Sequence, residues 1–256
     1  MRAVAGLALV LSVGCRAPRA VADPVPVPAG VSHAEWSRLL HDYVDDGGLV
    51  DYGRWKANPA DAGALARYLA AFGAAGTPAQ GPERVASAIN AYNALTVAWV
   101  LRHYPTTSIR AMKDSFTARR HRVGGRDVSL DDLEHKTLRP LAGYRVHAAL
   151  VCAARSCPPL RREAFLPATL EAQLDDAMAR WLARADLNRF DAEAGRARVS
   201  RIFDWFSEDF AQAGGLREVL RRHGPPDARA LAARGEPEVA FLDYDWSLND
   251  QRPPAP

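Results

Sequence analysis

The segment from Val85 to Leu101, VASAINAYNALTVAWVL, constrains the fold most, because apolar residues occupy nearly the whole circumference of the helix it would form. A helix of this kind is stable in a globular protein where other elements cover it on all sides. The segment is too short, and too often interrupted by polar residues, for a membrane span, which needs ~20 apolar residues. The sequence therefore predicts a buried central helix over residues 83–103.

Two asparagines on this helix require a specific environment. Asn90 and Asn93 are three residues apart and so lie on one helix face. Burying a carboxamide without hydrogen-bond partners costs ~1–3 kcal/mol, so both side chains must find partners. Two interpretations stay open: the amides hold the backbone of neighbouring loops, or they position a substrate carbonyl or a catalytic side chain.

The patterns around the central helix predict a predominantly helical α+β domain. Apolar spacing and capping residues predict further helices at residues 32–44, 59–74, 129–140 and 167–185, and one that Ser200 caps. Four extended segments are expected to form a small antiparallel sheet: residues 121–128, 144–152, 188–199 and 239–246. Two of them are predicted to be β-hairpins, one turning on Gly124 and Gly125 and the other near Ala194 and Gly195.

The N-terminus has the layout of a bacterial export signal: one arginine, an apolar run from Val4 to Val13, and then Gly14 and Cys15. Either Cys15 is lipidated, or the signal is cleaved after Ala22. We therefore expect a signal at residues 1–22, a Pro-rich linker at 23–31, one globular domain at 32–250 and a tail at 251–256. The mature protein is expected in the periplasm or tethered to the outer membrane as a lipoprotein.

The charge of the chain restricts its partners. The formal net charge is +3, from 33 basic and 30 acidic residues, and three of the arginines belong to residues 1–22. The mature chain is therefore close to neutral and lacks the electrostatic footprint of a nucleic-acid-binding protein. No nucleic-acid partner is expected, and the only membrane contact expected is an N-terminal lipid anchor.

The segment HAALVCAARSCPPL, residues 147–160, contains the only two cysteines after the leader, Cys152 and Cys157. In an oxidising compartment they can close a disulfide. A metal site with His147 and His135 is a second interpretation, but a C-x4-C pair with no second cluster departs from the usual zinc spacing. We expect no metal and no cofactor.

A nucleophilic Cys152 is the third interpretation. The predicted strand ends at Cys152, and Arg155 could favour its thiolate. In a strand, however, His147 and Cys152 point to opposite faces. The candidate catalytic residues are Cys152, His147, His135, Asn90 and Asn93. The candidate substrate-binding residues are Arg155, Ser156 and Glu134, with Cys157 as disulfide candidate and Cys15 as lipidation candidate.

Five segments, in this order, resemble the landmark segments of the domain of unknown function family 547 (DUF547). They are INAYNALTV (89–97), SLDDLEH (129–135), HAALVCAARSCPPL (147–160), RIFDWFSEDF (201–210) and YDWSLN (244–249). The resemblance covers residues 45–250 and implies an exported bacterial protein with no established activity. It also implies that Cys152 has a role that does not need Cys157, because plant members often have serine at the second position. Ser87 departs from the family pattern, which tends to have a bulky aromatic residue there.

Two functions remain in view. The first is a cysteine-dependent hydrolase or acyltransferase outside the cytoplasm, with a layout like that of papain-type or transglutaminase-like hydrolases, based on an analogy of parts. The alternative is a non-enzymatic module that binds a small ligand or a protein and whose cysteines form a structural disulfide. Its pocket would be lined by Trp246, Tyr244, Trp205 and Tyr92. A binding module would tolerate Cys152→Ser, whereas a thiol enzyme would lose turnover.

Overall fold

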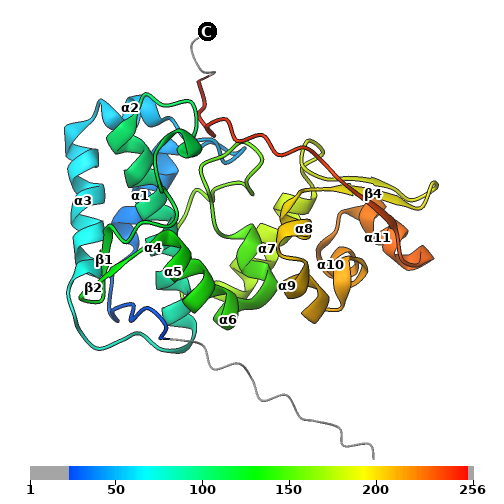
Figure 1. Ribbon diagram of the computed structural model, residues 1–256, viewed down its shortest axis with the longest axis horizontal. Coiled ribbons are helices and arrows are strands. Elements are labelled where there is room, and N and C mark those ends of the chain that lie inside the picture. The colour runs from blue at the N-terminus through cyan, green and yellow to red at the C-terminus, as the bar shows by residue number, and fades with distance from the viewer. Residues whose placement is uncertain (1–22, 253–256) are drawn as a thin grey trace, which may run out of the picture.

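The central helix α4 (Gly81–His103) lies at the core of the N-terminal part of the molecule (Figure 1). The structure is a computed structural model that describes residues 23–252. The predicted export signal, with Cys15, lies outside the described residues. Every residue of α4 from Val85 to Val97 is buried, Ser87 included, so the prediction of a buried helix is confirmed. Four elements pack on α4: α2 (Tyr52–Lys56), α3 (Pro59–Gly73), α5 (Leu130–Leu133) and a π-helical turn (Glu134–Leu138).

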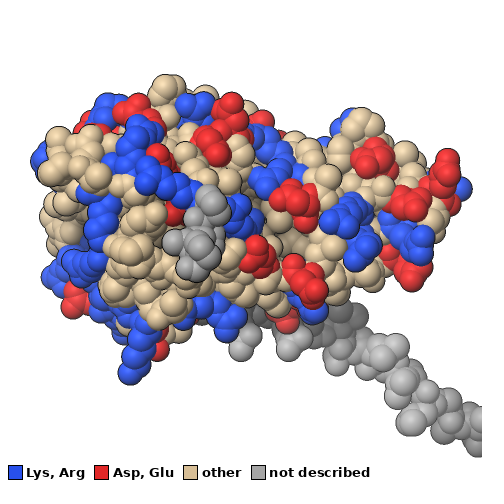
Figure 2. Space-filling view, turned by 90° about the horizontal axis from the view of Figure 1, so that it is seen from above, with Lys and Arg blue, Asp and Glu red and all other residues tan. Residues whose placement is uncertain are grey.

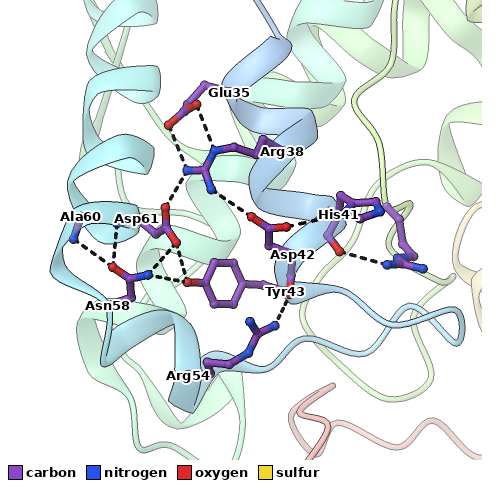
Figure 3. A network of polar contacts seen from close by, with 10 residues as sticks. Glu35, Arg38, His41, Asp42, Tyr43, Arg54, Asn58, Ala60 and Asp61 are labelled. Atoms are coloured by element: carbon purple, nitrogen blue, oxygen red, sulfur yellow. Dashed lines mark hydrogen bonds and ion pairs between the residues drawn. The ribbon is translucent and has the colours of Figure 1, made fainter.

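The helices α1 (Ala34–Tyr43) and α3 are joined by a polar network on the outer side of this core (Figure 3). Arg38 pairs with Glu35 and Asp42 on its own helix, and its Nη2 lies 2.6 Å from Oδ1 of Asp61 on α3. The Tyr43 hydroxyl donates to the same Asp61 carboxylate over 2.6 Å. The network fixes α1 against α3 while their apolar faces are buried against each other.

Residues 23–31, predicted as a linker, pack against the domain. Val25 is 2% exposed and Val27 is 0% exposed, and both belong to the larger hydrophobic cluster. Pro28 forms an isolated antiparallel bridge with Pro78. The segment is extended, as its proline content predicts, but its valines are core residues and do not act as a spacer.

The helical stretch that starts at α5 runs further than predicted. Ser129 and Asp132 form the capping box at its start, which confirms the predicted Ser129 cap. The chain then forms the π-helical turn and α6 (Arg139–Ala142), with Pro140 in the first turn of α6, where a missing backbone N–H is tolerated. The prediction that the helix stops at Pro140 is therefore wrong.

The predicted strand at residues 144–152 is also wrong. Residues Gly143–Ala148 form a 3₁₀ helix, here called η3. Residues 149–151 are buried and Cys152 is partly buried, but none of them belongs to a sheet. A short buried apolar run can be satisfied by a strand or by a helical turn, and periodicity alone does not separate the two. This correction matters for the site, because it removes the expectation that His147 and Cys152 face opposite ways.

The C-terminal part surrounds a second hydrophobic cluster, in which Trp181 of α7 stacks on Phe203 of α8 at 4.9 Å. Its helices are α7 (Leu170–Leu182), α8 (Ile202–Trp205), α9 (Ser207–Gln212), α10 (Gly215–His223) and α11 (Pro226–Arg234). A single-turn 3₁₀ helix, Ile109–Ala111, belongs to the N-terminal part. The described chain is thus mainly helical, as expected.

The strands form two small sheets and not the single sheet that the sequence suggested. A two-stranded hairpin pairs β1 (His121–Val123) with β2 (Arg126–Val128), and a three-stranded sheet has the order β3 (Arg189–Asp191), β4 (Arg196–Val199), β5 (Glu238–Phe241). Both predicted hairpins are confirmed. The pairing of β4 with β5 is parallel, so the expectation of a wholly antiparallel sheet is wrong, while the α+β class holds.

The chain after β5, residues 242–252 and here called the crossing segment, runs back over the molecule (Figure 1) to the residues just before α2, where Asp250 forms a parallel bridge with Val50. On the way, the Leu248 amide donates to Thr107, and the Asn249 amide donates to the Ala153 carbonyl over 3.1 Å. The Arg155 amide in turn donates to the Ser247 carbonyl over 2.9 Å. This crossing segment therefore holds the loop that carries the two cysteines.

On the face seen in Figure 2, basic and acidic side chains are interspersed over both parts of the molecule. This agrees with the nearly equal counts of basic and acidic residues in the sequence. None of the helices within residues 23–252 has the length and apolar character needed to cross a bilayer.

Candidate functional site

A cavity of about 180 Å³ lies where the two hydrophobic clusters meet. One side is formed by α4 and the helical stretch that follows Ser129, and the other by α8 and the crossing segment. Tyr244 packs against both clusters and lines the cavity. The site is therefore assembled from residues that are more than 150 positions apart in the chain, such as Tyr92 and Tyr244.

Aromatic rings form most of the apolar wall. Trp205, Tyr244 and Trp246 contact one another, with ring centroids 4.7 Å apart for Trp205–Tyr244 and for Tyr244–Trp246, and 5.8 Å apart for Trp205–Trp246. Trp205 is 47% exposed, which is unusual for so large an apolar side chain. An exposed aromatic ring at the mouth of a cavity is typical of a binding surface.

Cys152 and Cys157, which also line the cavity, are joined by a disulfide. Of the three interpretations of this pair, the disulfide is therefore confirmed. The Tyr244 hydroxyl lies 3.2 Å from the Cys152 sulfur and 3.4 Å from the Cys157 sulfur. In this state neither sulfur can be a nucleophile, since nucleophilic attack needs a free thiolate. Across residues 23–252 no cluster of three His, Cys, Asp or Glu side chains could hold a metal ion.

Glu134 is the acidic group most affected by the cavity. Its carboxylate accepts a hydrogen bond from the Tyr92 hydroxyl over 3.3 Å. Burial raises its pKa to about 7, and the neighbouring Asp131 acts in the same direction, although the Tyr92 bond opposes the rise. Neither Glu134 nor Asp131 is in an ion pair with any residue between 23 and 252. The cavity therefore holds two acidic side chains without a cationic partner.

His147 also lines the cavity and is held by a carboxylate. Its Nε2 is 2.8 Å from Oδ2 of Asp209, and its ring stacks on Phe206 with centroids 4.0 Å apart. Arg139 donates to both oxygens of Asp209, over 2.7 Å and 3.0 Å, and its Nη1 lies 3.1 Å from Nδ1 of His135. The charges of Arg139 and Asp209 thus compensate each other next to the cavity.

Burial determines the protonation of both histidines. It lowers the pKa of His147 even though the bond to Asp209 acts in the other direction, and it also lowers the pKa of His135. Burial alone would raise the pKa of Asp209, but the hydrogen bonds from His147 and Arg139 outweigh it and hold that pKa well below its usual range. At neutral pH we therefore expect two neutral imidazoles beside an ionised Asp209.

Four of the candidate residues line this one cavity: Cys152, His147, His135 and Glu134. Arg155 and Ser156 are not at its surface. The Arg155 guanidinium donates to the Asp250 carbonyl over 2.9 Å, and the Ser156 hydroxyl oxygen accepts from a backbone amide over 2.8 Å. Both residues hold the crossing segment in place, so the substrate-binding role expected for them has no support in the geometry.

Asn90 and Asn93 are absent from the cavity lining too. Asn90 donates to the Phe165 carbonyl over 2.8 Å and accepts from the Phe165 amide over 2.9 Å. Asn93 forms the same double contact with the Ala149 carbonyl and the Val151 amide, each over 2.9 Å. The amides hold loop backbone, which favours the first of the two interpretations over a catalytic role.

Asp209, Arg139 and Asp131 belong to the site but were not candidates from the sequence. Asp209 is part of RIFDWFSEDF, residues 201–210, a segment singled out in the sequence only by its resemblance to a family landmark. The sequence offered one indication of Asp209: this carboxylate comes directly before Phe210, whose ring is buried. Its histidine partner is 62 positions away, and no spacing rule connects the two.

Residues 78–182 match the model of the family described as "Protein of unknown function, DUF547". The DUF547 match contains α4, Glu134, His147 and both cysteines, whereas Asp209 and the aromatic residues at 205, 244 and 246 lie beyond it. No curated protein and no solved structure matches the chain.

Proposed function

We propose that the protein is a binding module of the bacterial envelope that takes a small organic molecule into the aromatic cavity. The observation that carries this proposal is the cavity itself, which is lined by Trp205, Tyr244 and Trp246 together with two carboxyl groups that have no ion-pair partner within residues 23–252. Apolar walls with a few fixed polar groups are the usual composition of small-molecule sites. The location in the envelope rests on the export signal at residues 1–22, with lipidation of Cys15 or cleavage after Ala22.

The disulfide has a structural role in this proposal. Cys152 and Cys157 form one wall of the cavity, and their loop is fixed by backbone bonds to the crossing segment. A loop this short gains little stability from cross-linking, ~2 kcal/mol or less, so the bond acts mainly on the shape of the wall. Ligand binding then needs an intact cavity but no free thiol.

Binding can be tested with exposed aromatic residues, whose replacement leaves the core intact. Trp205→Ala removes an aromatic ring at the cavity, and Phe241→Ala, a matched control, removes an exposed ring on β5. Small aromatic and amine compounds are screened by thermal shift and their affinities measured by calorimetry. We expect Trp205→Ala to weaken binding at least about tenfold and Phe241→Ala to leave it unchanged. Equal affinities in both variants would show that the cavity is not the site.

A thiol hydrolase with a papain-like layout is the second candidate, favoured by one observation. His147, oriented by Asp209, lines the same cavity as Cys152, so reduction of the disulfide would free a thiol in the cavity that also holds a histidine base. Alkylation of the exported protein with and without reduction, followed by mass spectrometry of the peptide with both cysteines, tests it. A free, fast-reacting Cys152 would favour the hydrolase. A quantitative disulfide that resists mild reductant would exclude it.

A further inference from the structure

We infer that the cavity recognises a small organic cation with a tertiary or quaternary ammonium group. The inference deepens the proposed function and rests on it, since it names the chemical class of the ligand. Two features lead to it: the aromatic wall, and the acidic lining, in which Glu134 and Asp131 have no ion-pair partner within residues 23–252.

The aromatic wall offers π faces that attract cations. A cation within ~6 Å of a ring centroid is attracted by the ring quadrupole, most strongly for Trp. Two rings at this cavity already hold guanidinium groups of the protein: Arg110 lies 4.9 Å from the centroid of Trp246, and Arg139 lies 5.0 Å from that of Phe206. Over the range 23–252, no Arg or Lys covers Trp205 or Tyr244. No guanidinium or ammonium group of these residues therefore competes with a cationic ligand for those two rings.

Among the residues that line the cavity, the groups that carry charge above pH 7 are acidic: Asp131, and Glu134, which ionises above its pKa of about 7. Arg110, which lies over the Trp246 ring, does not line the cavity. Arg139 is bound bidentately by Asp209, so this pair adds little net charge. Burial lowers the pKa of both histidines at the cavity, which therefore contribute no charge at neutral pH. Asp131 and Glu134 remain, and the described part of the chain gives neither of them an ion-pair partner. An anionic ligand would be repelled by them, and a neutral ligand would leave them unpaired.

Glu134 would gain most from a cationic partner. Its carboxyl has one hydrogen-bond donor, the Tyr92 hydroxyl, and burial raises its pKa to about 7. A bound ammonium group would favour the ionised form and bring that pKa back down. The cavity, at about 180 Å³, has room for a compact head group, since a dry cavity of ~150 Å³ holds a benzene molecule.

The experiment compares two ligands of the same shape. Choline carries a trimethylammonium group, and 3,3-dimethyl-1-butanol carries the same branched group without the charge. Both are titrated by calorimetry at pH 7.5 into the mature protein with its disulfide intact. We expect choline to bind on the order of tenfold more tightly than the neutral isostere. Glu134→Gln and Asp131→Asn should each reduce this preference, and Asp127→Asn, an exposed acid on β2, should not.

The outcomes separate failure of the inference from failure of the proposed function. Equal affinities for choline and its isostere, or a preference that survives both Glu134→Gln and Asp131→Asn, would overturn cation recognition while leaving the binding module intact. If neither compound binds but indole does, cation recognition is again overturned. If none of the three binds, the proposed function fails with it.

Discussion

Replacing Glu134 with glutamine should remove a pH dependence from the stability of the protein. Glutamine keeps the shape of the side chain and can still accept the hydrogen bond from Tyr92. It cannot ionise, however, so the variant isolates the free energy of placing a carboxylate in the cavity. This is the most direct test of the electrostatics of the site, and it needs no ligand.

The magnitude follows from the change in pKa. Burial raises the pKa of Glu134 from 4.5 to about 7. Each pKa unit corresponds to about 1.4 kcal/mol, which gives roughly 3 kcal/mol for the whole difference. Because the side chain is only partly shielded from solvent, we expect about 2–3 kcal/mol.

The sign follows from proton binding in the two states. Between pH 4.5 and pH 7 the unfolded chain has released the proton of Glu134 while the folded chain keeps it. Glu134 therefore does not lower the free energy of unfolding below pH 4.5, where its carboxyl is protonated in both states. As the pH rises from 4.5 to about 7, the free energy of unfolding falls, and above about pH 7 the loss is complete. Relative to the natural protein, Glu134→Gln should gain about 2–3 kcal/mol of stability between pH 4 and pH 8.

The assay is urea unfolding followed by circular dichroism at unit pH steps from about 4 to 8, with the free energy of unfolding extrapolated to zero urea. Only the difference between variant and natural protein is used, since other titrating groups cancel in it. Glu236→Gln, an exposed acid after α11, is the matched control and should give a flat difference curve. A difference curve for Glu134→Gln that changes by less than about 0.5 kcal/mol would refute the claim that the cavity desolvates this carboxyl.

Three further predictions concern the surroundings of the cavity. Asn93→Ala leaves one buried backbone carbonyl and one buried backbone amide without partners. It should lower the free energy of unfolding, measured in urea, by about 2–4 kcal/mol. A loss under about 1 kcal/mol would mean that water replaces the Asn93 side-chain amide. Replacing Cys152 and Cys157 together by serine should cost ~2 kcal/mol or less in thermal unfolding and leave ligand affinity within a few-fold, and loss of binding would contradict a purely structural disulfide. Asp209→Asn should lower the pKa of His147 further, because the carboxylate favours the charged imidazole, and a rise in the NMR titration of that ring would contradict the assignment.

Local patterns predicted the elements whose stability is local. Ser129 caps α5 because its hydroxyl and the Asp132 carboxylate satisfy each other's backbone amides, and four residues of sequence contain all that is needed. The hairpin of β1 and β2 turns at Gly124 and Gly125, both with positive φ, which glycine adopts without strain. These predictions required no knowledge of distant parts of the chain.

The segment at 144–152 could not be predicted in the same way. Its apolar residues are buried, as expected, but burial by α4 and the second cluster satisfies a helical turn as well as a strand. The backbone of its last residues is satisfied by Asn93, more than 50 positions earlier, and not by a neighbouring strand. A side chain that takes the place of a sheet partner leaves no periodic signal in the segment that it holds.

The sequence by itself determined the buried central helix, the α+β class, the two hairpins and four of the residues that line the cavity: Cys152, His147, His135 and Glu134. Tertiary structure decided how these residues act. It paired His147 with Asp209, closed the disulfide, and placed the aromatic residues of the crossing segment at the same cavity as Glu134. The physical reason is that hydrogen-bond patterns and apolar periodicity act over a few residues. Desolvation, charge balance and cavity shape, by contrast, depend on which distant segments pack together.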